Sequence, residues 1–232
     1  ISWVGHTIPT HLHVISAQVL LLKYCIVFFS KQGMQLIILL IICSGLLNVI
    51  LGDLCSICVC EEDVVSCRGM ELENHFNATH WNGTKQSIAD LSRNSIVHLR
   101  QFSEIGVNIL ILSHNTITKI DDACFKNLQN LTELDLSYNR LTSDQLNPHI
   151  FKGNYAPEKY EPLSNLRVLK LSSNALHTLH PDIFEHLPNI EHLSLDSNPF
   201  KVLDRSTVTA IGSIPFLKFL DFSSMYLKSI PE

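Results

Sequence analysis

The sequence has 232 residues, of which 46% are hydrophobic and 17% are charged. This length exceeds a typical domain of roughly 100 to 150 residues, so the chain can bury a core and also carry a leader. Lys23 and Lys31 are the only charged residues before Asp53, which leaves 15 basic and 22 acidic residues in the rest, a formal charge of −7. That charge argues against nucleic acid or an anionic membrane surface as partner, because both favour a net positive protein face.

Residues 34–52 predict a signal peptide. The apolar run from Leu36 to Leu51 carries no charge, begins just after Met34 and ends at the small Gly52, as in a cleaved secretory leader. The alternative is an uncleaved signal anchor, because the run is close to the lower limit of about 17 residues for a membrane span. Residues 1–33 precede Met34, and we interpret them as an upstream segment outside the mature protein.

Four cysteines with the spacing C-x2-C-x-C-x6-C directly follow this leader: Cys55, Cys58, Cys60 and Cys67. Four thiols this close together are either disulfide partners or metal ligands. Zinc ligands usually form two separated pairs around a longer loop, and export leads to an oxidising compartment in which disulfides persist. We therefore predict a disulfide-stapled cap over residues 53–80, with three pairings open.

About six copies of the pattern L-x-x-L-x-L-x-x-N-x-L follow in residues 81–232. The clearest are 131–141, 166–176 and 190–200, and weaker copies occupy 87–96, 107–117 and 217–227. Three of the four gaps between the turn asparagines fall within the 20 to 29 residues of leucine-rich repeats; these asparagines are Asn94, Asn115, Asn139, Asn174 and Asn198. The pattern predicts an α/β solenoid whose parallel strands form a concave face.

Each repeat is expected to bury two strand leucines, such as Leu134 and Leu136, and an asparagine amide at the turn, such as Asn139. The return limbs carry a phenylalanine that we expect in the core of the convex side: Phe125, Phe151 and Phe184. Cys124 lies where a small apolar residue would pack, so we predict a buried free thiol. The polar segment 153–162 lengthens one repeat and is expected to bulge as a loop.

The cysteine spacing together with these repeats resembles the extracellular leucine-rich-repeat proteins that have a cysteine-rich amino-terminal cap. The resemblance covers residues 55–232 and implies the bridges Cys55–Cys60 and Cys58–Cys67. It implies a location outside the cell, either secreted or at the plasma membrane. It also implies a binding role, as a cell-surface receptor or adhesion molecule; the alternative is a secreted matrix protein or signalling modulator.

Three N-x-[ST] motifs predict N-glycosylation, at Asn77, Asn82 and Asn130. Asn77 and Asn82 lie in the polar stretch between the cap and the first repeat. Asn130 directly precedes a predicted strand, where a glycan would stand at the edge of the sheet.

Side chains between the strand leucines are expected to face solvent on the concave side, where they mix aromatic, apolar and charged groups. Aromatic anchors within a polar rim are typical of protein interfaces. We therefore expect a protein ligand, with a second copy of the chain among the candidates, and any membrane tether after Glu232. The candidate binding residues are His114, Glu133, Asp135, Tyr138, Val168, Lys170, His192 and Phe219.

No enzyme motif is present in the sequence. There is no phosphate-binding glycine loop, no G-x-S-x-G and no H-E-x-x-H. The histidines are scattered, and His75 and His80 are five residues apart in a predicted loop, which suits no metal site. We expect a binding protein that uses no cofactor and has no catalytic activity.

Overall fold

The computed structural model describes residues 54–156 and 159–228. The predicted leader and the upstream segment lie outside the described residues. Within the described part, no helix is long and apolar enough to span a membrane.

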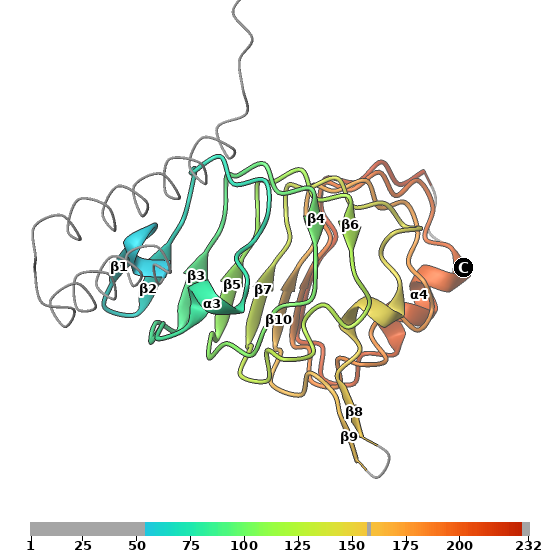
Figure 1. Ribbon diagram of the computed structural model, residues 1–232. Helices are drawn as coiled ribbons and strands as arrows, with labels where there is room; N and C mark the ends of the chain where they lie inside the picture. The colour runs from blue at the N-terminus through green and yellow to red at the C-terminus, as the bar shows by residue number, and fades with distance from the viewer. Residues whose placement is uncertain (1–53, 157–158, 229–232) are drawn as a thin grey trace, which may run out of the picture. The chain divides into compact units, whose positions relative to one another are not determined.

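An eight-stranded sheet runs through the described domain (Figure 1). The strands β2 to β12 of this sheet pair in parallel, and only β1 pairs antiparallel, as the outer strand of the cap hairpin. One strand per repeat is the arrangement that the sequence pattern predicts. In sheet order the strands are β1 (Val59–Glu61), β2 (Val64–Ser66), β3 (Ile88–Asp90), β5 (Ile109–Ile111), β7 (Glu133–Asp135), β10 (Val168–Lys170), β11 (His192–Ser194) and β12 (Phe219–Asp221).

In the main sheet, the central residue of each strand from β2 to β11 is buried in the core, whereas Leu220 of β12 is exposed. Leu110, Leu134 and Leu169 are opposite one another in the register, and each is fully buried. Their flanking residues are half-buried and face the other side of the sheet. Because side chains alternate along a strand, this register aligns one row of leucines inside and two rows of variable residues outside.

The turn asparagines bond their own repeat to the neighbouring one, as predicted. The Nδ2 atom of Asn139 donates to the carbonyl oxygens of Leu112 and Leu136, each at 3.0 Å, and its Oδ1 atom accepts from the Ile117 amide at 3.0 Å. Asn115, Asn174 and Asn198 repeat this arrangement. Buried backbone groups at each turn are thereby satisfied across the solenoid.

The residue before each turn asparagine, or before Met225 in the last repeat, has a left-handed backbone. Tyr138 has φ 54° and His114 has φ 55°, although neither is glycine. This conformation directs the His114 amide to the Ser137 carbonyl at 3.0 Å and the Tyr138 amide to the Ser172 carbonyl at 2.9 Å. The bonds between repeats offset the cost of an uncommon conformation, which is of order 1 to 3 kcal/mol.

The return limbs hold short elements and a row of aromatic rings. Phe102, Phe125 and Phe151 are fully buried and stack in succession, with ring centroids 6.0 and 6.1 Å apart. Phe184 is buried as predicted, whereas Phe102 was not among the predicted core rings. Their elements are the 3-10 helix η2 (Pro148–Phe151), helix α4 (Arg205–Gly212), and strands β4 (His98–Leu99) and β6 (Lys119–Ile120). The 3-10 helix η1 (Leu54–Ser56) and helix α3 (Ala78–Trp81) precede the first repeat.

The inserted segment forms a hairpin, so the predicted loop is wrong. Strands β8 (Asn154–Ala156) and β9 (Lys159–Glu161) pair antiparallel and extend away from the solenoid (Figure 1). Gly153 permits this pairing, because an added Cβ would lie 2.0 Å from the Glu161 carbonyl oxygen. The Tyr160 hydroxyl bonds His186 Nδ1 at 2.5 Å, which fixes β9 to the following return limb.

Candidate binding surface

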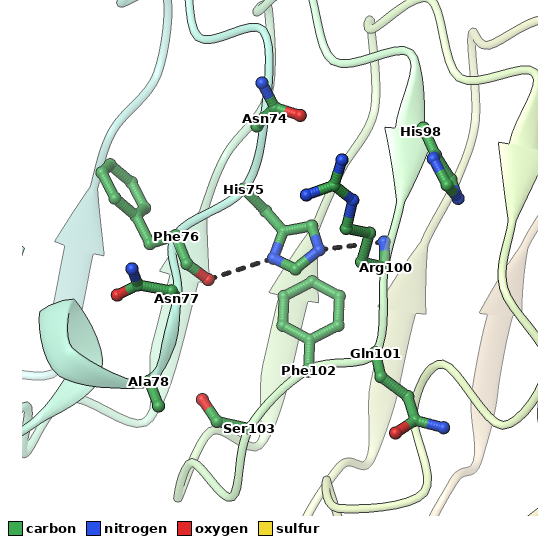
Figure 2. Close-up of a pocket in the computed structure, with 10 residues that line it drawn as sticks. All are labelled: Asn74, His75, Phe76, Asn77, Ala78, His98, Arg100, Gln101, Phe102 and Ser103. Carbon is green, nitrogen blue, oxygen red and sulfur yellow. Dashed lines mark hydrogen bonds between the residues drawn. The ribbon is translucent and has the colours of Figure 1, made fainter.

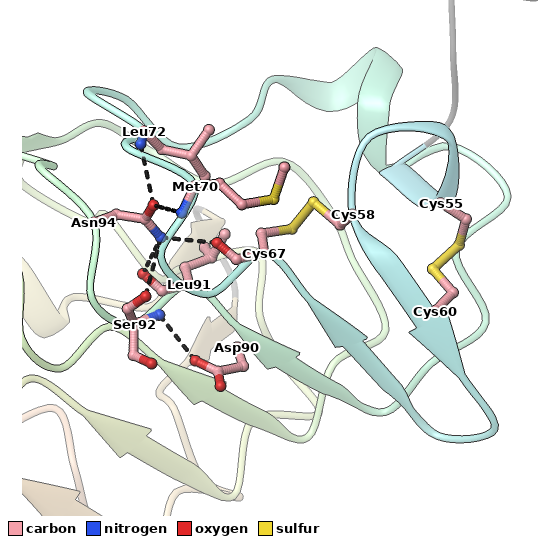
Figure 3. Close-up of a disulfide and its surroundings, with 10 residues drawn as sticks. All are labelled: Cys55, Cys58, Cys60, Cys67, Met70, Leu72, Asp90, Leu91, Ser92 and Asn94. Atoms are coloured by element: carbon pink, nitrogen blue, oxygen red, sulfur yellow. Dashed lines mark hydrogen bonds between the residues drawn. A yellow bond between two sulfur atoms is a disulfide. The ribbon is translucent and has the colours of Figure 1, made fainter.

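The cap contains both disulfides that the family resemblance implied, Cys55–Cys60 and Cys58–Cys67. Cys58 and Cys67 are buried, whereas Cys55 is exposed. Asn94 ties the cap to the first repeat, because it donates to the Cys67 carbonyl at 2.9 Å (Figure 3). Strand β2 of the cap also pairs with β3, so the cap continues the sheet.

The solvent side of strands β5, β7, β10, β11 and β12 forms a continuous surface, which we call the sheet face. Its side chains come from the two outer positions of each strand. Six of the eight predicted binding residues therefore lie on one surface. The sheet face consists of Ile109, Ile111, Glu133, Asp135, Val168, Lys170, His192, Ser194, Phe219 and Asp221.

Charged groups of the sheet face and its margin are paired between neighbouring strands. The Lys170 ammonium lies 2.6 Å from the Glu133 carboxylate. At the margin, Glu191 lies 2.7 Å from Lys218 and 3.7 Å from Arg167. The hydrogen bond from Lys218 is the main cause of the lowered pKa of Glu191. Oppositely charged side chains thus lie in contact on this surface, which offers ion pairs to a ligand.

Aromatic and apolar groups lie between these charges. His192 and Phe219 are exposed, and their ring centroids are 5.9 Å apart on adjacent strands. Val168 is half-buried between Glu133 and His192 in the register. The sheet face thus combines an aromatic pair, aliphatic side chains and ion pairs on a hydrogen-bonded scaffold.

His114 and Tyr138 lie outside the strands whose side chains form the sheet face. Both follow their strands and occupy the left-handed turn position before the asparagine. Their rings stack with centroids 4.2 Å apart and an interplanar angle of 9°. Because the turn reverses direction there, strand alternation does not apply, and the pair forms an exposed ledge at the rim.

A cavity of about 300 Å³ lies between residues 74–78 and the limb that follows β4. His75 and Phe102 stack beside it, and Arg100, His98 and Asn77 are also in its lining (Figure 2). Burial is the main cause of the lowered pKa of His75. Both His75 ring nitrogens bond backbone groups, which makes this histidine part of the packing.

Further predictions concern Cys124, a metal site and the sequon asparagines. Cys124 is a buried free thiol, as predicted, and burial raises its pKa. Within residues 54–156 and 159–228, no group of three or more His, Cys, Asp or Glu side chains could hold a metal ion. All three sequon asparagines are exposed: Asn77, Asn82 and Asn130.

This chain is similar to known proteins over its repeats. The family described as "Leucine rich repeat" matches residues 105–155 and 157–200. Keratocan of Coturnix japonica is 31% identical over 127 residues, which cover 55% of this chain and 32% of keratocan. This chain contains leucine-rich repeats and is similar to extracellular leucine-rich-repeat proteins. It lies outside the cell, secreted or on the extracellular side of the plasma membrane.

Other similar proteins show the same partial coverage. Toll-like receptor 9 of Mus musculus is 31% identical over 130 residues, which cover 54% of this chain and 12% of the receptor. A solved structure, the TLR13–ssRNA13 complex, superposes with a TM-score of 0.58 at 28% identity, over 71% of this chain and 22% of that one. This chain therefore spans about a third or less of these relatives. Because that complex contains RNA, the fold itself does not exclude nucleic acid, and our expectation of a non-nucleic-acid partner rests on charge alone.

Proposed function

We propose that the sheet face binds a protein ligand and that this domain is the ectodomain of a cell-surface receptor or adhesion molecule. The observation that supports it is the exposed His192–Phe219 pair beside Val168 and the paired charges of Glu133 and Lys170. Aromatic anchors surrounded by polar groups contribute most of the binding energy in protein interfaces. The backbone ladder beneath these side chains holds them in place before binding, which lowers the entropic cost of association.

The alternative class is a secreted matrix protein or signalling modulator built on the same repeats. Both classes use binding and need no cofactor, so we propose that the domain acts without catalysis. The two differ in whether the full protein is tethered. Cell-surface labelling of the full-length protein distinguishes them, because a tethered receptor remains with the cells and a secreted protein accumulates in the medium.

The test of the sheet face uses matched substitutions on the full chain secreted from animal cells. The protein is screened against an array of purified extracellular proteins that includes the chain itself, and each hit is measured by surface plasmon resonance. Val168→Arg places a cation in the centre of the sheet face, whereas Val208→Arg does so on the exposed side of α4. The proposal expects Val168→Arg to weaken the Kd at least about 30-fold, as for a hot-spot residue.

Phe219→Ala is expected to weaken binding in the same direction, and Val208→Arg to leave it within about 2-fold, because scattered surface changes cost little. A partner that binds wild type and Val168→Arg equally, but loses affinity for Val208→Arg, would move the binding surface to the convex side. Equal secretion and equal Tm of the variants exclude misfolding as the cause.

A further inference from the structure

Two of the predicted glycosylation sites flank the same short segment of the solenoid. Asn82 lines a cavity of about 230 Å³, and Asn130 lines a separate one of about 360 Å³. The residues common to both cavities are Glu104, Ile105 and Gly106, which we call the 104–106 ridge. The ridge lies at the edge where the chain enters the strands, since residue 106 leads into β5 and Asn130 leads into β7.

Local structure exposes both asparagine side chains. Asn82 follows the last residue of α3, and Gly83, with φ 86°, turns the chain so that the Thr84 amide bonds the Trp81 carbonyl at 3.1 Å. Asn130 lies in a turn that is closed by the Leu131 amide on the Leu128 carbonyl at 3.0 Å. A turn presents its central side chain to solvent, and an exposed amide in an N-x-Thr motif can carry a glycan in a secreted protein.

The lining of the two cavities suits sugar. The cavity at Asn130 is bordered by the amides of Asn127, Gln129 and Asn154 and by the carboxylates of Glu104 and Glu161. Such groups donate and accept hydrogen bonds, which is what sugar hydroxyls require. Glu104 and Gly106 of the ridge are exposed, whereas Ile105 between them is buried. A Cβ added at Gly106 would meet nothing within 4 Å, so the space above Gly106 is open.

We propose that N-linked glycans on Asn82 and Asn130 converge over the 104–106 ridge, seat their first sugars in the two cavities and close this edge to protein partners. Asn77 differs, because it lines the cavity beside His75 and Phe102 and does not border the ridge. Given the proposed function, closure of this edge restricts the ligand to the sheet face and the opposite rim, where His114 and Tyr138 stack.

Proteolysis at the ridge tests the proposal without any binding partner. The full chain is secreted from animal cells, and mass spectrometry measures the occupancy of each sequon. Endoproteinase Glu-C then cleaves after Glu104, an exposed residue, and peptide mapping follows the rate of that one cleavage. Wild type is compared with Asn82→Gln, Asn130→Gln, the double variant and the control Asn77→Gln.

We expect both asparagines to be occupied, the double variant to be cleaved after Glu104 at least about 10-fold faster than wild type, and Asn77→Gln to match wild type. Unoccupied Asn82 or Asn130 would overturn the proposal, and so would occupied sites whose joint removal leaves the rate unchanged. Equal Tm values for wild type and the double variant exclude general unfolding as the reason for faster cleavage. Since no readout involves a ligand, failure here would leave binding by the sheet face standing.

Discussion

The imidazole ring of His75 stacks on the phenyl ring of Phe102, with centroids 4.3 Å apart and an interplanar angle of 21° (Figure 2). Phe102 in turn stacks on Phe125, and Phe125 on Phe151. His75 therefore covers the outer end of the row of rings, and both His75 and Phe102 line the cavity. The ring also bonds backbone on both sides, at the Phe76 carbonyl and the Arg100 amide.

The His75 contacts predict an acid-sensitive domain. The Arg100 amide donates to Nε2 at 3.0 Å, so the folded state holds a neutral ring with its proton on Nδ1. Burial lowers the pKa of His75 below 6.5, and the nearby positive charges of Arg100 and His98 act in the same direction. The unfolded chain therefore binds a proton near pH 6.5, whereas the folded chain does so only at lower pH. Stability from this group is complete above pH 6.5 and is lost as the pH falls from 6.5 to the lowered pKa.

Urea unfolding at several pH values between 7.5 and 5 checks this sign. His75→Gln removes the titration and should reduce the fall in stability over that range. His192→Gln is the matched control, because His192 is exposed on β11, and it should follow the wild-type profile. Identical pH profiles for wild type and His75→Gln would contradict the assignment.

The repeat pattern predicted the strands and the asparagine ladder because both depend on local spacing. Leu134 is buried and Asn139 bonds its neighbouring repeat since the period of the sequence matches that of the solenoid. His114 and Tyr138 have a left-handed backbone, so strand alternation does not give the direction of their side chains.

Contacts between distant segments could not be read from spacing. Phe102 lies in the irregular stretch QFSEIG, outside any copy of the repeat, and only the fold brings it against Phe125. The hairpin was missed because its segment has no alternating apolar pattern. Its pairing depends on the close approach of Gly153 to Glu161, which is a property of the backbone. Likewise, only the fold brings Asn82 and Asn130 to the two sides of the 104–106 ridge.

Loss of one turn asparagine should destabilise the domain strongly. Asn139→Ala leaves the Ile117 amide without its hydrogen-bond partner and removes one bond from each of the carbonyls of Leu112 and Leu136, which still accept from Asn115 and Asn174. We expect a loss of about 1 to 3 kcal/mol in the free energy of unfolding. Asn139→Asp keeps the acceptor but turns a charged oxygen toward those carbonyls, so it should cost at least as much. Chemical denaturation measures both variants. The control Asn108→Ala removes an exposed side chain and should stay within about 0.5 kcal/mol.

Gly153 should be the residue on which the hairpin depends. Gly153→Ala places a Cβ 2.0 Å from the Glu161 carbonyl oxygen, which forces β8 and β9 apart. Hydrogen exchange of the β9 amides should become faster, and overpacking should cost about 1 to 3 kcal/mol. Gly106→Ala, where nothing lies within 4 Å, should change neither quantity appreciably. Equal exchange in the two variants would show that the hairpin does not need this close approach.

The cysteines should differ in reactivity according to their burial. Without reductant, Cys124 should not react with iodoacetamide in the native protein, because it is buried and its thiol pKa is raised. With a low concentration of reductant, the Cys55–Cys60 disulfide should be reduced before Cys58–Cys67, because only the first bridge includes an exposed cysteine, Cys55. Peptide mapping of alkylated sites gives the order. Simultaneous opening of the two bridges would mean that the cap unfolds as a unit before reduction.

An engineered glycan on the sheet face provides the strictest test of where the ligand binds. Val168→Asn combined with Lys170→Thr creates an N-x-Thr motif in the centre of β10. A bulky, solvated glycan at that position should abolish ligand binding, because it covers both the His192–Phe219 pair and Glu133. A variant with Lys170→Ser would still contain the motif and is therefore no control. The control is Val168→Gln with Lys170→Thr, which lacks the asparagine and cannot be glycosylated. The control should lose only the small contribution of one exposed ion pair, below about 1 kcal/mol, together with that of the valine.

If the glycosylated variant is secreted, occupied at residue 168 and still binds like its control, the ligand contacts another surface, and the rim at His114 and Tyr138 becomes the next to test.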